Sequence, residues 1–145
     1  AIGGVSAPAS AKSKGYVFKY KGVSVTMNGA AKKLIKKAGK PSKKTVKKSC
    51  AYKGKDRTYT YKDFQLKTYS KTNNGAEYVS EIRFRSNKAV TKEGIRIGSS
   101  LKDVTKKYGK AKARFGVYTF KKGSSKLQIM LNGNKVSAIR YFASK

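Results

Sequence analysis

The sequence contains the run Val79-Ser80-Glu81-Ile82-Arg83-Phe84, and 57 positions later it contains Val136-Ser137-Ala138-Ile139-Arg140-Tyr141. The last three residues of each run alternate apolar, basic and aromatic, a period of two that is typical of a strand with one buried face. The isoleucine and the aromatic residue then share the buried face in each run. Two runs this similar indicate an internal duplication of the chain.

A helix is expected ahead of each of these strands, over 29–38 and again over 99–108. Apolar residues at i, i+3, i+4 and i+7 predict the first helix, and three of these positions are matched 70 residues later. A glycine follows each segment, where it can end a helix in the left-handed conformation. Asn28 is a candidate cap for the first helix and Ser99 or Ser100 for the second, where Ser100 with Asp103 is also a candidate capping box.

Short strands are expected around both helices. Two of them flank a tight turn at Lys21-Gly22, over 16–20 and 23–27. Three strands are expected after the first helix, over 57–61, 64–69 and 78–85. Three more are expected after the second helix, over 117–120, 127–131 and 136–142. Residues 94–98 are expected to end a further strand. Alternation places one set of apolar residues together under the helices: Phe64, Leu66, Ile82, Phe84, Leu127, Ile129, Ile139 and Tyr141.

The order of these elements predicts an α+β fold of two tandem helix-plus-antiparallel-sheet repeats, with the helices packed on one face of the sheet. Residues 1–15 are expected to form a flexible leader, residues 16–92 the first repeat and residues 93–145 the second. A repeat of this size is marginally stable by itself, so we expect the two to pack as one body.

Two helix-then-sheet units in tandem resemble the β-lactamase-inhibitor-protein-like architecture. The run G-I-x-I-G-S-S-x-x-D-V-x-x-x-Y-G at 94–109 is similar to the strand-to-helix signature of that superfamily and of related small outer-membrane assembly lipoproteins. The pattern S-C-A-Y-x-G-x-D-x-x-Y-x-Y-x-x-F at 49–64, with T-x-E-G-I at 91–95, resembles a group of uncharacterised secreted proteins of gut Gram-positive bacteria. The resemblance implies a fold but no inhibitory activity, since no inhibitory loop aligns residue by residue and the single cysteine cannot form the inhibitor's disulfides.

Positive charge dominates the composition. The 145 residues hold 36 Lys and Arg against six Asp and Glu, which gives a formal net charge of +30. Such a charge attracts polyanions over long range. The largest local excess is a lysine cluster whose members either bind a polyanion, such as a cell-wall polymer or an acidic glycan, or form a solvated helix face and loop: Lys32, Lys33, Lys36, Lys37, Lys40, Lys43, Lys44, Lys47 and Lys48.

The polar face of the expected strands is a second candidate surface. Basic residues alternate there with aromatic ones, a combination that suits an interaction surface, although single exposed apolar residues also occur on ordinary solvated faces. The candidates on this face are Lys67, Tyr69, Arg83, Arg85, Met130, Arg140 and Phe142.

The composition argues against most catalytic sites. The chain has no His and one Cys, which excludes a Ser-His-Asp triad, a Cys-His pair and the usual Cys/His zinc site. The six acids are scattered, mostly near expected turns, and no phosphate-binding loop is present. We therefore expect no enzyme, no catalytic residue, no metal site and no cofactor. Cys50 is expected to be a small buried side chain in a strand.

The sequence predicts a non-enzymatic secreted or cell-surface binding module with a polyanion or a protein as its partner. The small, polar opening run A-I-G-G-V-S-A-P-A-S looks like a mature N-terminus after removal of a signal peptide, whereas a native start would favour the cytoplasm. No apolar run approaches the roughly 20 residues of a transmembrane helix. A nucleic-acid-binding protein and a proteinaceous inhibitor of an extracellular enzyme remain alternatives.

Overall fold

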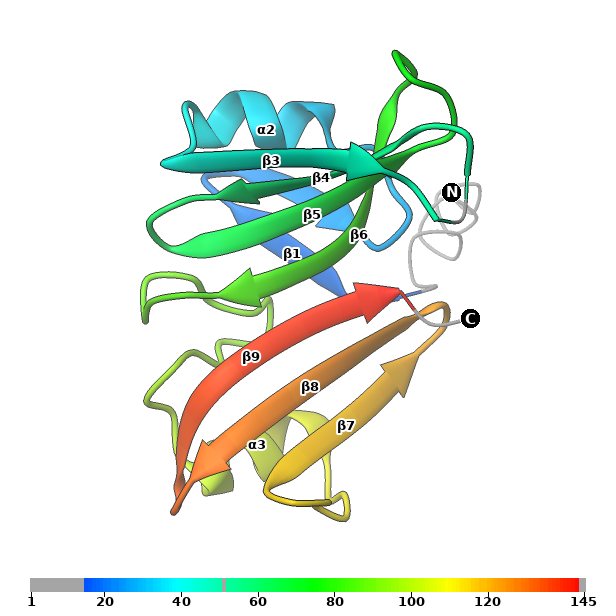
Figure 1. Cartoon of the computed structure of the whole chain (residues 1–145). Helices are drawn as coiled ribbons and strands as arrows, with labels where there is room; N and C mark the ends of the chain where they lie inside the picture. Colours follow the sequence, from blue (N-terminus) through cyan, green and yellow to red (C-terminus); the bar gives the residue numbers. More distant parts are fainter. Residues whose placement is uncertain (1–14, 51, 144–145) are drawn as a thin grey trace, which may run out of the picture.

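Strands dominate the computed structural model, which describes residues 15–50 and 52–143. They account for 48% of the structure, and helices account for 12%. One sheet has two strands, β1 (Val17–Tyr20) and β2 (Val23–Thr26), and the other has seven antiparallel strands in the order β3-β4-β5-β6-β9-β8-β7 (Figure 1). The remaining elements are α2 (Lys32–Ala38), β3 (Lys43–Lys48), β4 (Lys55–Thr60), β5 (Phe64–Ser70), β6 (Glu77–Phe84), α3 (Leu101–Tyr108), β7 (Val117–Lys122), β8 (Ser125–Asn132) and β9 (Lys135–Ala143).

The expected α+β fold of two tandem helix-plus-sheet repeats is wrong, because the chain is mostly β. The two similar runs, in β6 and β9, pair with each other at the centre of the large sheet, with Ile82 opposite Tyr141. The strands before and after α3 therefore form one continuous sheet. The domain boundary expected after residue 92 stays a prediction, and residues 1–14 of the expected leader lie outside the described residues.

The first helix is shorter than expected for a physical reason. Gly29 and Ala31 exchange backbone hydrogen bonds with β6, from Val79 N to Gly29 O (2.9 Å) and from Ala31 N to Glu77 O (3.0 Å). This segment therefore continues the sheet contacts, and α2 begins only at Lys32. Asn28 does not cap α2. Its backbone has a φ of 67° and its side chain accepts a hydrogen bond from Tyr69.

The second helix has the expected cap. Ser100 Oγ accepts a hydrogen bond from the backbone N–H of Asp103 at 3.1 Å, which satisfies one of the free donors at the start of α3. Gly39 and Gly109 follow α2 and α3 with φ values of 80° and 90°. Both helix ends thus follow the pattern expected from the sequence.

Two expectations about strands are wrong. Residues 94–98 form a loop in which both glycines have positive φ, so no strand ends there. Residues 43–48 form strand β3, although four of its six residues are lysines, a residue type that strands disfavour. β3 pairs only with β4 and lies at the edge of the sheet, where exposed lysines protect the free strand edge from pairing with other chains.

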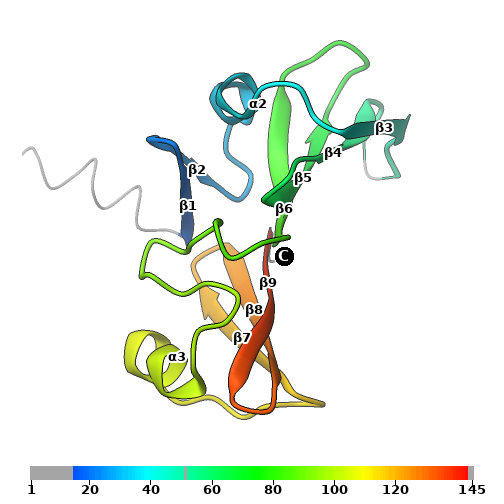
Figure 2. The same ribbon diagram turned by 90° about the vertical axis from the view of Figure 1, so that its left-hand side faces the viewer.

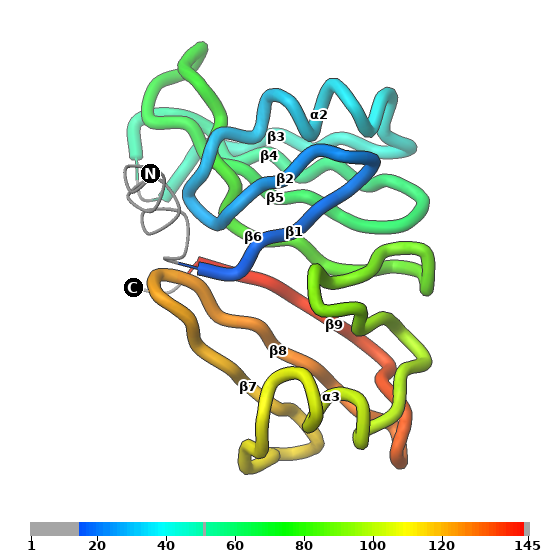
Figure 3. The backbone as a smooth tube through the Cα atoms, turned by 180° about the vertical axis from the view of Figure 1, so that it is seen from behind, coloured from blue at the N-terminus to red at the C-terminus, as the bar shows by residue number. Residues whose placement is uncertain are grey.

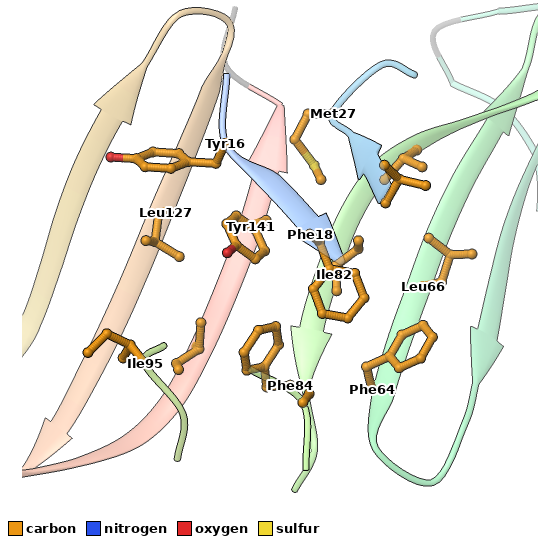
Figure 4. Close-up of a cluster of buried hydrophobic side chains, with 14 of the residues drawn as sticks. Tyr16, Phe18, Met27, Phe64, Leu66, Ile82, Phe84, Ile95, Leu127 and Tyr141 are labelled. Carbon is orange, nitrogen blue, oxygen red and sulfur yellow. The ribbon is translucent and has the colours of Figure 1, made fainter. Parts of the chain in front are cut away.

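The core lies between the large sheet and the elements on one of its faces. Figures 2 and 3 show α2, the β1–β2 hairpin and α3 on the same side of the sheet. Phe18 from β1 lies at the centre of this layer, with ring centroids 5.3 Å from Phe64, 5.5 Å from Phe84 and 6.2 Å from Tyr141 (Figure 4). All eight side chains expected on the buried face are buried. β1 therefore ties the two halves of the sheet together.

The other face of the seven-stranded sheet carries no covering layer among the described helices and strands, and it faces the viewer in Figure 1. We call it the open face. Side chains reach it in a regular alternation that two bulges interrupt, one in β6 beside Lys67 and Thr68 and one in β9 beside Met130 and Leu131. The first bulge explains why Val79 and Ile82, three positions apart, are both buried.

Candidate polyanion-binding face

The strand register fixes which side chains share the open face, because residues directly opposite in an antiparallel pair point the same way. One line of opposite residues runs through the middle of the sheet and gives six polar side chains, one from each of six strands. We call this line the polar row: Thr60, Gln65, Arg83, Arg140, Gln128 and Thr119. Its residue types read the same from either end, and with neighbouring strands about 4.8 Å apart it spans about 24 Å.

Glu81 lies buried next to the centre of the polar row. Its Oε2 is 2.5 Å from Nε of Arg83 and 3.1 Å from Nε of Arg140, and its Oε1 accepts a hydrogen bond of 3.3 Å from Nη2 of Arg140. Only 11% of the Glu81 side chain is exposed, against 52% of the Arg83 side chain. A single carboxylate therefore holds two guanidinium groups in place.

The pKa of Glu81 follows from this arrangement. Burial by itself raises the pKa of the carboxyl. The hydrogen bond from Arg83 and the positive charges of Arg140 and Lys67 outweigh burial, so the pKa of this carboxyl lies below its ordinary value. Glu81 is therefore ionised at neutral pH and cannot act there as a proton donor.

Arg140 and Arg83 differ in how many of their donors are already bonded. Arg140 also donates from Nη1 to Gln128 Oε1 at 3.1 Å, and its guanidinium carbon lies 4.4 Å from the centroid of the Phe142 ring. For Arg83, the bond from Nε to Glu81 is the only one to another part of the described chain, so both Nη nitrogens are free. The two Nη nitrogens at the exposed end of Arg83 are thus available to donate hydrogen bonds to a ligand.

Further basic and aromatic groups flank the polar row. Lys67 is opposite Glu81, and Lys126 is opposite both Phe142 and Lys121. Near the C-terminal end of β5, the ring of Tyr52 stacks on that of Tyr69 with centroids 5.0 Å apart. The ring centroids of Tyr69 and Tyr78 are 5.6 Å apart. The open face therefore combines positive charge with flat aromatic rings.

The residues predicted for the polar strand face are largely found together. Lys67, Tyr69, Arg83, Arg140 and Phe142 lie on the open face, and Met130 lies on its β8 part with 45% exposure. Arg85 follows the end of β6, where its guanidinium donates to the backbone oxygen of Tyr61. Their assignment as binding residues stays a prediction.

The predicted lysine cluster does not form one surface. Lys32, Lys33, Lys36 and Lys37 are exposed on α2, and Lys40 is exposed after it. Lys43 and Lys47 reach the open face, opposite Thr60 and Asp56. Lys44 and Lys48 alternate to the helix side of the sheet, where Lys44 Nζ lies 5.2 Å from the ring centroid of Tyr59. The sheet therefore separates the lysines of the cluster.

Sequence reasoning missed the neutral members of the polar row. It also missed that Glu81 pairs with both arginines at the centre of the row. Thr60, Gln65, Gln128 and Thr119 carry no charge and stood out in no motif. A signal existed for Gln65 and Gln128, because each directly adjoins a strand residue that was correctly placed in the core. The register across six strands, which aligns them, is not visible in a local pattern.

Two of the other acids are hydrogen-bonded to hydroxyl groups on the described chain, and the cysteine is exposed. Glu77 accepts hydrogen bonds of 2.7 Å from Tyr59 and Thr68, and Glu93 accepts one of 2.7 Å from Tyr108. Within residues 15–50 and 52–143, no group of three His, Cys, Asp or Glu side chains could hold a metal ion. Cys50 is exposed, so its expected burial in a strand is wrong, because it lies in the loop after the edge strand β3.

Nothing in the described part of the chain resembles a membrane-spanning helix, since neither α2 nor α3 is long or apolar enough. Comparison of the chain with protein-family models, with curated proteins and with solved structures finds no match. The resemblance to the β-lactamase-inhibitor-protein-like architecture and to secreted gut-bacterial proteins therefore stays a prediction.

Proposed function

We propose that this protein is a non-enzymatic, secreted or cell-surface binding module whose open face binds a polyanion such as a cell-wall polymer or an acidic glycan. One observation carries the proposal. Basic side chains reach this uncovered face from every strand of the large sheet except β4, and only Asp56 and Glu81 oppose them there. The basic members are Lys43, Lys47, Lys67, Arg83, Arg140, Lys126 and Lys121.

Charge and shape have different roles in this function. The net charge of +30 attracts any polyanion, but the attraction is screened over about 8 Å at physiological salt. The binding affinity then depends on side chains that one ligand molecule can contact at the same time. The open face supplies such groups on a rigid surface, whereas α2 offers long, mobile lysine side chains on a helix of seven residues.

The chemistry of the same face favours binding over catalysis. Its buried acid, Glu81, is held ionised by two arginines, so it lacks the raised pKa of a general acid. Asp56 lies opposite Tyr69 and has no acidic partner opposite it, whereas glycoside hydrolysis needs two facing carboxylates.

The test compares two sets of three lysines. The variant Lys67→Gln/Lys121→Gln/Lys126→Gln removes charge from the open face, and Lys36→Gln/Lys37→Gln/Lys106→Gln removes the same charge from the helices. Binding of each to polygalacturonate, poly(glycerol phosphate) and duplex DNA is measured from low to physiological salt. For duplex DNA each lost phosphate contact changes the slope of log K against log salt by about 0.9.

We expect the open-face variant to lose affinity for every bound polymer and to show a shallower salt slope, while the helix variant changes little. Equal losses in the two variants would mean that the charge acts only as a diffuse field and would contradict the proposal. Binding of one DNA sequence in preference to others would instead favour the nucleic-acid alternative.

A further inference from the structure

Building on the proposed function, we propose that the polar row binds a linear acidic polysaccharide that lies across the strands, with the free end of Arg83 contacting a carboxylate of the polymer. The inference narrows the polyanion to one chemical class. It depends on three features of the row: its length, its mixture of hydrogen-bond donors and acceptors, and the number of donors that each arginine has left free.

The row is long and is not covered by any described helix or strand. It crosses six adjacent strands in register, from Thr60 in β4 to Thr119 in β7. A line of side chains about 24 Å long suits an extended polymer better than a compact molecule. The residue types repeat in mirror order about the Arg83–Arg140 pair, but the free groups of Gln65 and Gln128 differ and Lys43 of β3 lies opposite Thr60 at one end.

The row offers acceptors as well as donors. Gln65 donates from Nε2 to Thr60 Oγ1 at 3.2 Å, which leaves its Oε1 as an acceptor without a partner in the described chain. Gln128 accepts from Arg140 through Oε1, which leaves its Nε2 as a donor. The backbone of duplex DNA offers only acceptors and gains nothing from the Gln65 oxygen, and poly(glycerol phosphate) offers a single hydroxyl donor per repeat. A sugar polymer carries hydroxyl groups that donate and accept, and so it can use both amides.

Arg83 supplies the charge recognition. Glu81 accepts a hydrogen bond from its Nε, and neither Nη nitrogen has a hydrogen-bond partner in the described chain. A guanidinium fork binds two oxygens of a carboxylate or of a phosphate, which a lysine ammonium cannot do. The selectivity for a sugar polymer therefore depends on the neighbouring amides, which align a carboxylate of that polymer on Arg83. Arg140 is held on three sides by Glu81, Gln128 and Phe142, and it supports the site without offering a comparable fork.

Aromatic rings complete the surface. Phe142 lies beside the row on β9, under the Arg140 guanidinium, and Tyr69 and Tyr78 lie farther along β5 and β6 on the same face. Flat apolar rings next to planar polar groups suit the mixed apolar and hydroxylated faces of sugar rings.

The experiment uses three variants of the whole chain. Arg83→Lys keeps the charge but removes the fork, and Gln65→Ala/Gln128→Ala removes the amides without altering charge. Arg96→Lys is the matched control, because Arg96 is exposed in the loop before α3 and lies outside the polar row. Binding to polygalacturonate, poly(glycerol phosphate) and duplex DNA is measured at one salt concentration, and thermal unfolding confirms that each variant is folded.

We expect Arg83→Lys to weaken polygalacturonate binding by about tenfold, while binding to DNA and poly(glycerol phosphate) changes less than about twofold. The double glutamine variant is expected to show the same selective loss, and Arg96→Lys no loss. Affinity for galacturonate oligomers is expected to rise with oligomer length until the oligomer spans the row.

Two outcomes separate this inference from the proposed function. If the wild-type protein binds all three polymers but neither row variant changes the preference among them, the inference is wrong and the open face is a general polyanion surface. If the wild-type protein binds none of them at low salt, the proposed function itself is wrong.

Discussion

Arg83 and Arg140 stand directly opposite each other in the central β6–β9 pair, and Glu81 forms an ion pair with both, accepting hydrogen bonds from Nε of Arg83 and Nη2 of Arg140. Like charges directly opposite on a sheet destabilise it. The buried carboxylate removes this repulsion and leaves one exposed guanidinium end. The stability of the sheet centre and the chemistry of the open face thus depend on the same acid.

Replacement of Glu81 by Gln tests the first of these roles. The substitution keeps the shape but leaves two arginines facing each other without a counter-charge. Because both arginines are partly exposed, we expect a loss of only about 1–2 kcal/mol in the free energy of unfolding, less than for a fully buried pair. Urea denaturation measures it, with Asp103→Asn on the exposed side of α3 as the control, and equal effects of the two substitutions would contradict the assigned role of Glu81.

The contribution of Glu81 depends on pH in a defined direction. Its pKa is lower in the folded protein than in the unfolded chain, so its stabilisation is fully present above the unfolded pKa of about 4.3. It is lost as the pH falls through the folded pKa, while the facing groups Arg83, Arg140 and Lys67 stay charged. The difference in unfolding free energy between wild type and Glu81→Gln should therefore shrink between pH 6 and pH 2. A difference that stays constant across this range would show that ionisation of Glu81 does not matter.

A buried tyrosine, Tyr141, and a half-buried one, Tyr108, lead to opposite expectations for the removal of their hydroxyl groups. The Tyr141 hydroxyl is buried and has no hydrogen-bond partner among the described residues, whereas the Tyr108 hydroxyl bonds both Thr91 and Glu93 at 2.8 and 2.7 Å. An unsatisfied buried hydroxyl costs stability, and a bonded one contributes about 1 kcal/mol. We expect Tyr141→Phe to leave the melting temperature unchanged or raise it, and Tyr108→Phe to lower it. The reverse order would show that the Tyr141 hydroxyl has a partner.

The exposure of Cys50 can be measured directly. Because its side chain is exposed in the loop after β3, we expect a thiol reagent to label the native protein nearly as fast as the unfolded chain. Much slower labelling of the native protein would support the burial that the sequence had suggested.

Local patterns predicted the core better than they predicted the fold. Alternation placed Phe64, Leu66, Ile82 and Tyr141 correctly, because it depends only on the period of a strand. The fold class failed because the pairing of β6 with β9 is a contact between distant segments, which turns the strands of both halves into one sheet. Strand β3 was missed because its lysines are stabilised by an edge position, not by local propensity.

The candidate site was predicted in the same partial way. The charged and aromatic members of the open face, such as Arg83 and Phe142, followed from alternation and from their chemical character. Gln65 and Gln128 could be recognised as site residues only from the strand register, which places them opposite Arg83 and Arg140. The local sequence could not show that the lysine cluster is divided, because a strand sends successive residues to opposite faces and so separates Lys43 from Lys44.

The central claim is that the open face is the binding surface, and side-chain NMR of the arginine Nε–H groups during titration with polygalacturonate tests it most directly. The chain has six arginines, and two of them lie at the centre of the polar row. We predict that the Nε–H signals of Arg83 and Arg140 shift first and farthest, while those of Arg96 and Arg114 stay in place. Shifts of similar size in all six signals, or the largest shift at Arg96 or Arg114, would contradict the claim.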